Sequence, residues 1–135
     1  MRYMLDTNIC IYLLKRHPPQ VFDRLAKLHV GDVLMSSITL AELRHGGGGQ
    51  SEVDYAQDMA ALDALLQDIP AMPFDDDAAK TYGALARTSK LKRKQALDNL
   101  IAAQAISANA ILVTNNENDF KGYLGLTVEN WATPI

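Results

Sequence analysis

The stretch Tyr-Met-Leu-Asp-Thr-Asn-Ile-Cys-Ile-Tyr-Leu-Leu at residues 3–14 decides the fold class of this chain. A short apolar run leads directly into Asp6 and two small polar residues, and an apolar-periodic segment follows. This order predicts a buried strand, a tight turn and a helix. Ligands of open α/β sheets bind outside the carboxyl ends of the strands. We therefore expect Asp6 at the edge of the sheet where a functional site would lie.

The same order recurs along the chain. Further short apolar runs stand at 33–35, 71–74, 111–113 and 126–128, with helical patterns between them. Because these runs are apolar throughout and do not alternate, they predict strands of a mostly parallel sheet that is covered on both faces. The four glycines at 46–49 predict the end of a helix and a connection, since glycine weakens a helix interior.

Composition narrows the class of protein. A length of 135 residues is enough for one domain with a proper core. The net charge of −3 gives no overall attraction to nucleic acid, so RNA binding would need a local basic patch. A single cysteine, Cys10, cannot form an internal disulfide, which favours a reducing compartment and a buried thiol. With no signal-peptide pattern and no membrane-span run, we expect a cytoplasmic protein.

Acidic residues follow or precede several of the predicted strands. Asp6 ends the first, Glu42 lies one turn into the helix after the second, and Asp98 is expected to open the apolar helix at 100–107. Asp119 follows the strand at 111–113.

Each acid also has a purely structural interpretation. Asp6 or Asn8 could cap the first helix, the segment from Thr39 to Glu42 matches a capping box, and Asp98 is a good N-cap. Asp119 could be a solvated loop acid.

The acids taken together favour a metal site. Carboxylates are seldom placed among apolar neighbours without a partner, and several at one sheet edge cannot all ionise without a cation. All are hard oxygen ligands without a histidine or cysteine cluster, a set that suits Mg²⁺ or Mn²⁺ and not zinc. Such ions bridge phosphate oxygens and activate water. The reaction class indicated is metal-assisted phosphodiester hydrolysis.

Four sequence blocks resemble those of a known family. They are Met-Leu-Asp-Thr-Asn at 4–8, Ser-Ser-Ile-Thr-Leu-Ala-Glu-Leu at 36–43, Asp-Asn-Leu-Ile-Ala-Ala at 98–103 and Thr-Asn-Asn-Glu-Asn-Asp-Phe at 114–120. In this order and spacing they resemble the PIN-domain ribonucleases, and among them the VapC toxins of bacterial toxin–antitoxin pairs. The resemblance covers the whole chain and so implies a single PIN domain at residues 1–135.

The resemblance implies a three-layer α/β/α fold with a central, mostly parallel sheet of four to five strands, and a homodimer. It implies an endoribonuclease that depends on Mg²⁺ or Mn²⁺ and acts commonly on tRNA, in this subgroup often initiator tRNA. Cleavage would block translation and growth. A VapB-like antitoxin would inhibit the toxin, and operator DNA would be bound only through that antitoxin.

The resemblance also assigns roles to residues. It places the metal ion on three acids and adds a fourth acid to the catalytic set; these are Asp6, Glu42, Asp98 and, as the fourth, Asp119. It places supporting polar groups at Asn8, Thr39, Thr114 and Asn116. Three features depart from the family pattern. Asn116 stands where many members have another acid, Gln104 where relatives often have histidine, and the segment at 94–97 where the family often has a glycine-containing turn.

Basic residues form one dense run just before Asp98. Lys90, Lys92, Arg93 and Lys94 could place RNA phosphates beside the metal, although a solvated loop is the ordinary interpretation of such a run. Arg44 is the next candidate for RNA contact, but two residues from Glu42 it does not share that residue's helix face.

Two other classes of function remain open. A non-catalytic PIN-fold module that binds RNA or protein would be expected to have lost one of the first three acids, and none is lost. A phosphate-accepting signalling domain would have a lysine at the end of a late strand, where this chain has Thr-Asn-Asn at 114–116.

Overall fold

The computed structural model describes residues 1–46, 48–88 and 91–132. Within these ranges five strands form a single parallel sheet in the order β3-β2-β1-β4-β5. The strands are β1 (Arg2–Leu5), β2 (Val33–Ser36), β3 (Ala71–Met72), β4 (Ala110–Val113) and β5 (Val128–Glu129). The helices are α1 (Thr7–Lys15), α2 (Pro19–Ala26), α3 (Ser37–His45), α4 (Glu52–Asp68), α5 (Asp76–Thr88) and α6 (Ala96–Ser107), with short 3-10 helices η1 (Arg93–Gln95) and η2 (Glu117–Phe120).

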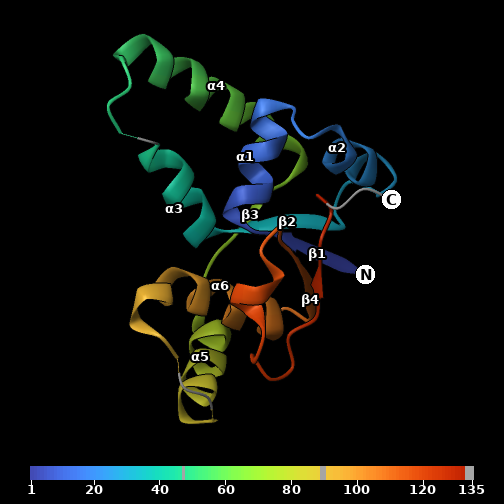
Figure 1. Cartoon of the computed structure of the whole chain (residues 1–135), viewed down its shortest axis with the longest axis vertical. Helices are drawn as coiled ribbons and strands as arrows, with labels where there is room; N and C mark the ends of the chain where they lie inside the picture. The colour runs from blue at the N-terminus through green and yellow to red at the C-terminus, as the bar shows by residue number, and fades with distance from the viewer. Residues whose placement is uncertain (47, 89–90, 133–135) are drawn as a thin grey trace.

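The elements form three layers, as expected from the sequence (Figure 1). Helices α1, α2 and α4 cover one face of the sheet, whereas α5 and α6 cover the other. Helix α3 leaves the end of β2 at the side of the sheet and packs against both α1 and α6. None of the helices in the described ranges is long and apolar enough to cross a lipid bilayer.

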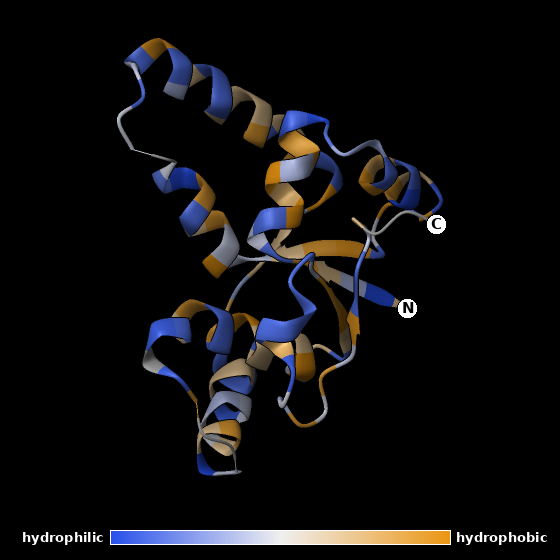
Figure 2. Cartoon of the chain, in the orientation of Figure 1, coloured by the Kyte–Doolittle hydropathy of each residue, from blue (hydrophilic) through white to orange (hydrophobic). Residues whose placement is uncertain are grey.

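The central strand β1 explains why the strand sequences are apolar throughout. Leu5 joins the core on the α1 side, together with the single cysteine Cys10 and Trp131, and all are buried. Met4, the next residue along the strand, points to the opposite face and packs with Ile101 of α6. Successive strand residues face opposite sides, so a sheet covered twice needs apolar residues at every position. Figure 2 shows this as hydrophobic colour in the strands at the centre of the molecule.

The observed starts of α3 and α6 show that two structural interpretations of the acids are wrong. Helix α6 begins at Ala96 directly after η1, so Asp98 lies inside its first turn and is not its N-cap. Helix α3 begins at Ser37, and its cap is the Ser36 hydroxyl, which accepts from the Ile38 N–H at 2.9 Å. The segment from Thr39 to Glu42 is therefore not a capping box, because the strand runs into the helix without a loop.

Other boundaries differ by a few residues. The last strand pairs through Val128 and Glu129, slightly later than the expected 126–128. The edge strand β3 stops at Met72, before Pro73, and so covers only the first half of the expected run at 71–74. Gly46 ends α3 with a φ of 74°, a left-handed value that suits glycine, and Gly47 lies outside the described residues.

A buried polar network joins β2, β3 and α6. The Ser36 hydroxyl donates to Gln104 Oε1 at 2.5 Å, and Gln104 Nε2 donates to the carbonyls of Met72 and Pro73 at 2.9 and 3.0 Å. Both side chains are essentially inaccessible to solvent. Gln104 thus satisfies carbonyls at the carboxyl ends of the strands and fixes α6 against that edge.

Gln104→Ala should lower the free energy of unfolding by about 2–3 kcal/mol, because it leaves the buried Ser36 hydroxyl and two carbonyls without their partner. Urea denaturation measures this difference. The matched control is Gln67→Ala on the exposed face of α4, which should change the free energy by less than about 0.5 kcal/mol. Equal stability of the two variants would contradict the role of Gln104.

Candidate active site

Asp6 lies at the carboxyl edge of the sheet, held by both neighbouring elements. Its backbone N–H donates to the Val113 carbonyl at 2.9 Å, which continues the pairing of β1 with β4. Its carboxylate accepts from the Ile9 N–H at 2.9 Å and so caps α1. Only 6% of the residue is exposed. The prediction that Asp6 caps α1 is therefore confirmed. The same residue also lies at the edge of the sheet where the site was expected.

The environment of Asp6 disfavours its charge. Burial raises the pKa of this carboxyl from 3.8 to about 6, against the opposing hydrogen bonds from the Thr114 hydroxyl and the Ile9 N–H. The charges of Asp98 and Glu42 make smaller contributions to the same rise in pKa. Glu42 is bonded to Thr7, the residue after Asp6, and Asp98 lies in the first turn of α6, so the three acids predicted from the sequence face the same edge.

Glu42 is held by a hydroxyl on α1. Thr7 Oγ1 donates to Glu42 Oε1 at 2.7 Å and lies 3.4 Å from Oγ1 of the buried Thr39. Sequence reasoning found Glu42 and Thr39 but missed Thr7, which joins them. Thr7 follows Asp6 directly, and its position in the motif was the signal that could have found it.

Asp98 and Asp119 complete the group of acids. Burial raises the pKa of the Asp98 carboxyl, and the charges of Asp119 and Glu42 raise it further. Asp119 lies on η2, where the Asn116 side-chain amide donates to its carboxylate. The Asn116 N–H in turn donates to the Thr114 hydroxyl at 3.0 Å. Thr114 and Asn116 thus connect the end of β4 to Asp119, and their supporting role in the site stays a prediction.

This donor set fits a hard divalent cation. The acids supply only oxygen ligands, and their mutual repulsion at a desolvated edge is what a cation relieves. Among the described residues, however, no three acidic, histidine or cysteine side chains are already close enough to form a metal-binding group. Glu42 is instead turned to Thr7. Residues that would hold an ion are Asp6, Glu42 and Asp98.

The remaining residues that were predicted for the site or for RNA contact lie on several different elements. Asn8 is exposed on α1, and Arg44 forms an ion pair with Asp63 of α4, with 2.8 Å between nitrogen and oxygen. Arg93 and Lys94 lie on η1, where Lys94 is exposed. Lys92 lines a cavity next to Asp119. The remaining candidate, Lys90, lies outside the described residues.

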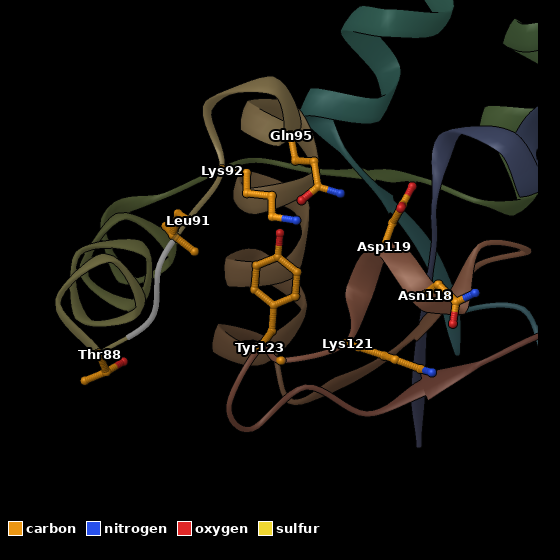
Figure 3. Close-up of a pocket in the computed structure, with 9 residues that line it drawn as sticks. Thr88, Leu91, Lys92, Gln95, Asn118, Asp119, Lys121 and Tyr123 are labelled. Carbon is orange, nitrogen blue, oxygen red and sulfur yellow. The ribbon is translucent and has the colours of Figure 1, made fainter.

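This cavity, of about 420 Å³, opens beside the acids between the segment at 91–95 and the segment at 118–123 (Figure 3). Polar and aromatic side chains that sequence reasoning did not select line it, among them Gln95, Asn118 and Tyr123. Burial raises the pKa of the Tyr123 hydroxyl, and the charges of Asp98 and Asp119 add to this effect. The cavity therefore adjoins the group of acids.

Comparison with known proteins defines the class. The model of the PIN domain family matches residues 3–123. This chain therefore belongs to the PIN domain family.

Its relatives include VapC ribonucleases. Ribonuclease VapC2 of Rickettsia felis is 38% identical, and the match covers 97% of this chain and 98% of the relative. The tRNA(fMet)-specific endonuclease VapC of Shigella flexneri is 33% identical, over 98% and 99% of the two chains. A crystal structure of VapBC2 from Rickettsia felis bound to a DNA fragment from their promoter superposes with a TM-score of 0.82 at 35% identity, and covers 97% of this chain and 99% of that one.

Asp6→Asn should make metal-free protein more stable at alkaline pH. The native pKa of about 6 exceeds the ordinary 3.8, so the contribution of Asp6 to stability is complete below pH 3.8 and is lost as the pH rises through about 6. Asparagine removes the buried charge but still caps α1. The variant should gain up to about 3 kcal/mol near pH 8, and this gain should vanish near pH 4.

Urea denaturation in a chelator, repeated across this pH range, measures the difference. Asp23→Asn on the exposed face of α2 is the matched control and should follow the wild type at every pH. Parallel pH profiles for wild type and Asp6→Asn would contradict the assigned environment of Asp6.

Proposed function

We propose that this chain is the toxin of a type II toxin–antitoxin system and an endoribonuclease that depends on Mg²⁺ or Mn²⁺. Its substrate class would be tRNA, with initiator tRNA as the first candidate, because the Shigella flexneri relative is a tRNA(fMet)-specific endonuclease. The observation that carries this proposal is the placement of Asp6, Glu42 and Asp98 at one edge of a PIN fold, where Asp6 caps α1, Glu42 is bonded to Thr7 and Asp98 lies in the first turn of α6. The whole sequence, residues 1–135, would act as one PIN domain.

The mechanism assigns a separate task to each acid. Asp6, Glu42 and Asp98 would hold the ion, which when bound supplies charge stabilisation to the phosphate and lowers the pKa of water. Asp119 would accept a proton from the attacking water, since its carboxylate lies beside the group and is oriented by Asn116. The neutral Asn116 adds a hydrogen bond without a further negative charge.

Two threonines prepare the site for this chemistry. Thr7 restrains Glu42 through its hydroxyl, and the Thr114 hydroxyl favours the ionised form of Asp6. Both groups act on the ligand carboxylates before any ion binds. The Thr114 bond lowers the cost of ionising Asp6, whereas the Thr7 bond keeps Glu42 in a defined position from which it would turn toward the ion.

The partners follow from the same proposal. A VapB-like antitoxin would bind and inhibit the chain, and the toxin would contact operator DNA only indirectly through it. The similar Rickettsia felis structure, a VapBC2 complex bound to a promoter fragment, supports this proposal. The toxin would act as a homodimer in the cytoplasm, where tRNA cleavage blocks translation. Lys92, Arg93 and Lys94, with Lys90 beside them in the sequence, would attract the RNA backbone. Arg44 would have to leave Asp63 to take part.

Purified toxin, free of antitoxin, should cleave tRNA in Mg²⁺ or Mn²⁺ and stop in a chelator. Asp6→Asn should lower the rate at least about 100-fold, because a metal ligand is lost while the helix cap remains. Gel analysis of a total tRNA digest measures the rate.

The matched control is Asp32→Asn, which lies before β2 at the opposite edge of the sheet and should cleave like the wild type. Undiminished cleavage by Asp6→Asn or by chelated protein would refute the mechanism. RNA binding without cleavage by the wild type would favour the alternative of a non-catalytic PIN-fold module.

A further inference from the structure

The cavity beside Asp119 has a composition that the four acids do not explain. The segment at 91–95 forms one wall and the segment at 118–123 the other. In Figure 3 the Lys92 amine and the Tyr123 hydroxyl point toward the same space, with the Gln95 amide beside them. Lys121 contributes its stem to the wall, and its amine extends outward. The cavity therefore combines a cation, an amide and an aromatic ring near a carboxylate.

Both walls of this cavity are fixed from within the fold. The Tyr123 hydroxyl donates to Asn99 Oδ1, and Asn99 Nδ2 donates to the Lys92 carbonyl at 3.1 Å. Asn99 lies on α6, next to Asp98, and is 3% exposed. The ring of Tyr123 also packs on Phe120, with 6.0 Å between ring centroids. The cavity is thus preorganised, and one buried amide joins it to the helix that carries Asp98.

These groups match the parts of a nucleotide. An ammonium group pairs with a phosphate, an aromatic face stacks with an unpaired base, and amides such as those of Gln95 and Asn118 bond to base edges. A volume of about 420 Å³ falls within the range of small-ligand pockets. The acids of the site repel the RNA backbone. Lys92 lines the cavity together with Asp119 and brings a positive charge to it that offsets this repulsion.

We propose that this cavity, the Tyr123 pocket, is a nucleotide-binding subsite that takes an unstacked nucleotide of the RNA next to the scissile phosphate. Its phosphate lies on Lys92 and its base against the ring of Tyr123. The proposal rests on the proposed ribonuclease function and deepens it, since it names the part of the RNA that the chain reads. An unpaired loop nucleotide fits this subsite, whereas a base held in a duplex does not.

The first test measures binding of the tRNA species that wild-type protein cleaves, transcribed in vitro and fluorescently labelled. All variants carry Asp6→Asn to prevent cleavage, and anisotropy is recorded at one fixed salt concentration. Lys92→Ala and Tyr123→Leu should each weaken binding about tenfold. Tyr123→Phe retains the ring and should bind within about twofold of the parent. Lys27→Ala, beyond the opposite face of the sheet, is the charge-matched control and should not change binding.

The second test asks whether a particular base meets the ring. Nucleotides around the mapped cleavage site are replaced one at a time by abasic residues. We expect one abasic position to weaken binding to the Asp6→Asn protein but not to the same protein that also carries Tyr123→Leu. The abasic residue and the leucine each remove the same contact between base and ring.

The outcomes separate the two proposals. If wild-type protein cleaves tRNA but folded Lys92→Ala and Tyr123→Leu bind like the parent, or no abasic position couples to Tyr123, the subsite is refuted alone. If wild-type protein neither binds nor cleaves tRNA, the ribonuclease proposal is refuted and the subsite with it. Lys92 is exposed, so its variant remains informative even if Tyr123→Leu fails to fold.

Discussion

The structure depends on carboxylates that face one edge of the sheet, where Asp6 is buried and Glu42 and Asp98 are half-buried. Asp6 is nearly buried, and the charges of Asp98 and Glu42 act on it at short range. A parallel sheet makes this possible, because strand ends and helix starts meet at the same edge. Asp6 caps α1 and Asp98 lies in the first turn of α6, so positive helix ends partly offset the repulsion. The remaining repulsion is what a bound cation would relieve.

Supporting contacts hold this unfavourable arrangement in place. Gln104 ties α6 to the ends of β2 and β3, and Thr7 holds Glu42 against α1. Asn99 extends the same support from α6 to the Tyr123 pocket. The repulsion among the acids lowers the stability of the fold at this edge. The two apolar cores on either side of the sheet offset that loss. One helix, α6, connects the acids, the strand edge and the pocket.

Much of this architecture could be predicted from the sequence, because apolar runs and helical periodicity are local signals. The acids could be found for the same reason, since Asp6 directly follows β1 and Asp119 lies in the polar segment after β4. The roles of Asp98 and Glu42 as helix caps were predicted wrongly, because a capping pattern does not show that Ser36 or an η1 turn already begins the helix. The contacts from Thr7 to Glu42 and from Tyr123 to Asn99 join residues 35 and 24 positions apart, and only the folded chain shows them.

Anomalous diffraction from crystals soaked in Mn²⁺ tests most directly whether the acids form a cation site. We expect a manganese peak bounded by the carboxylates of Asp6, Glu42 and Asp98, with Glu42 turned from Thr7 toward the ion. The peak should be absent from Asp6→Asn crystals and present in Asp23→Asn crystals. A peak only elsewhere, for example at the exposed acids of 75–77, or no peak at this edge in the wild type, would contradict the account.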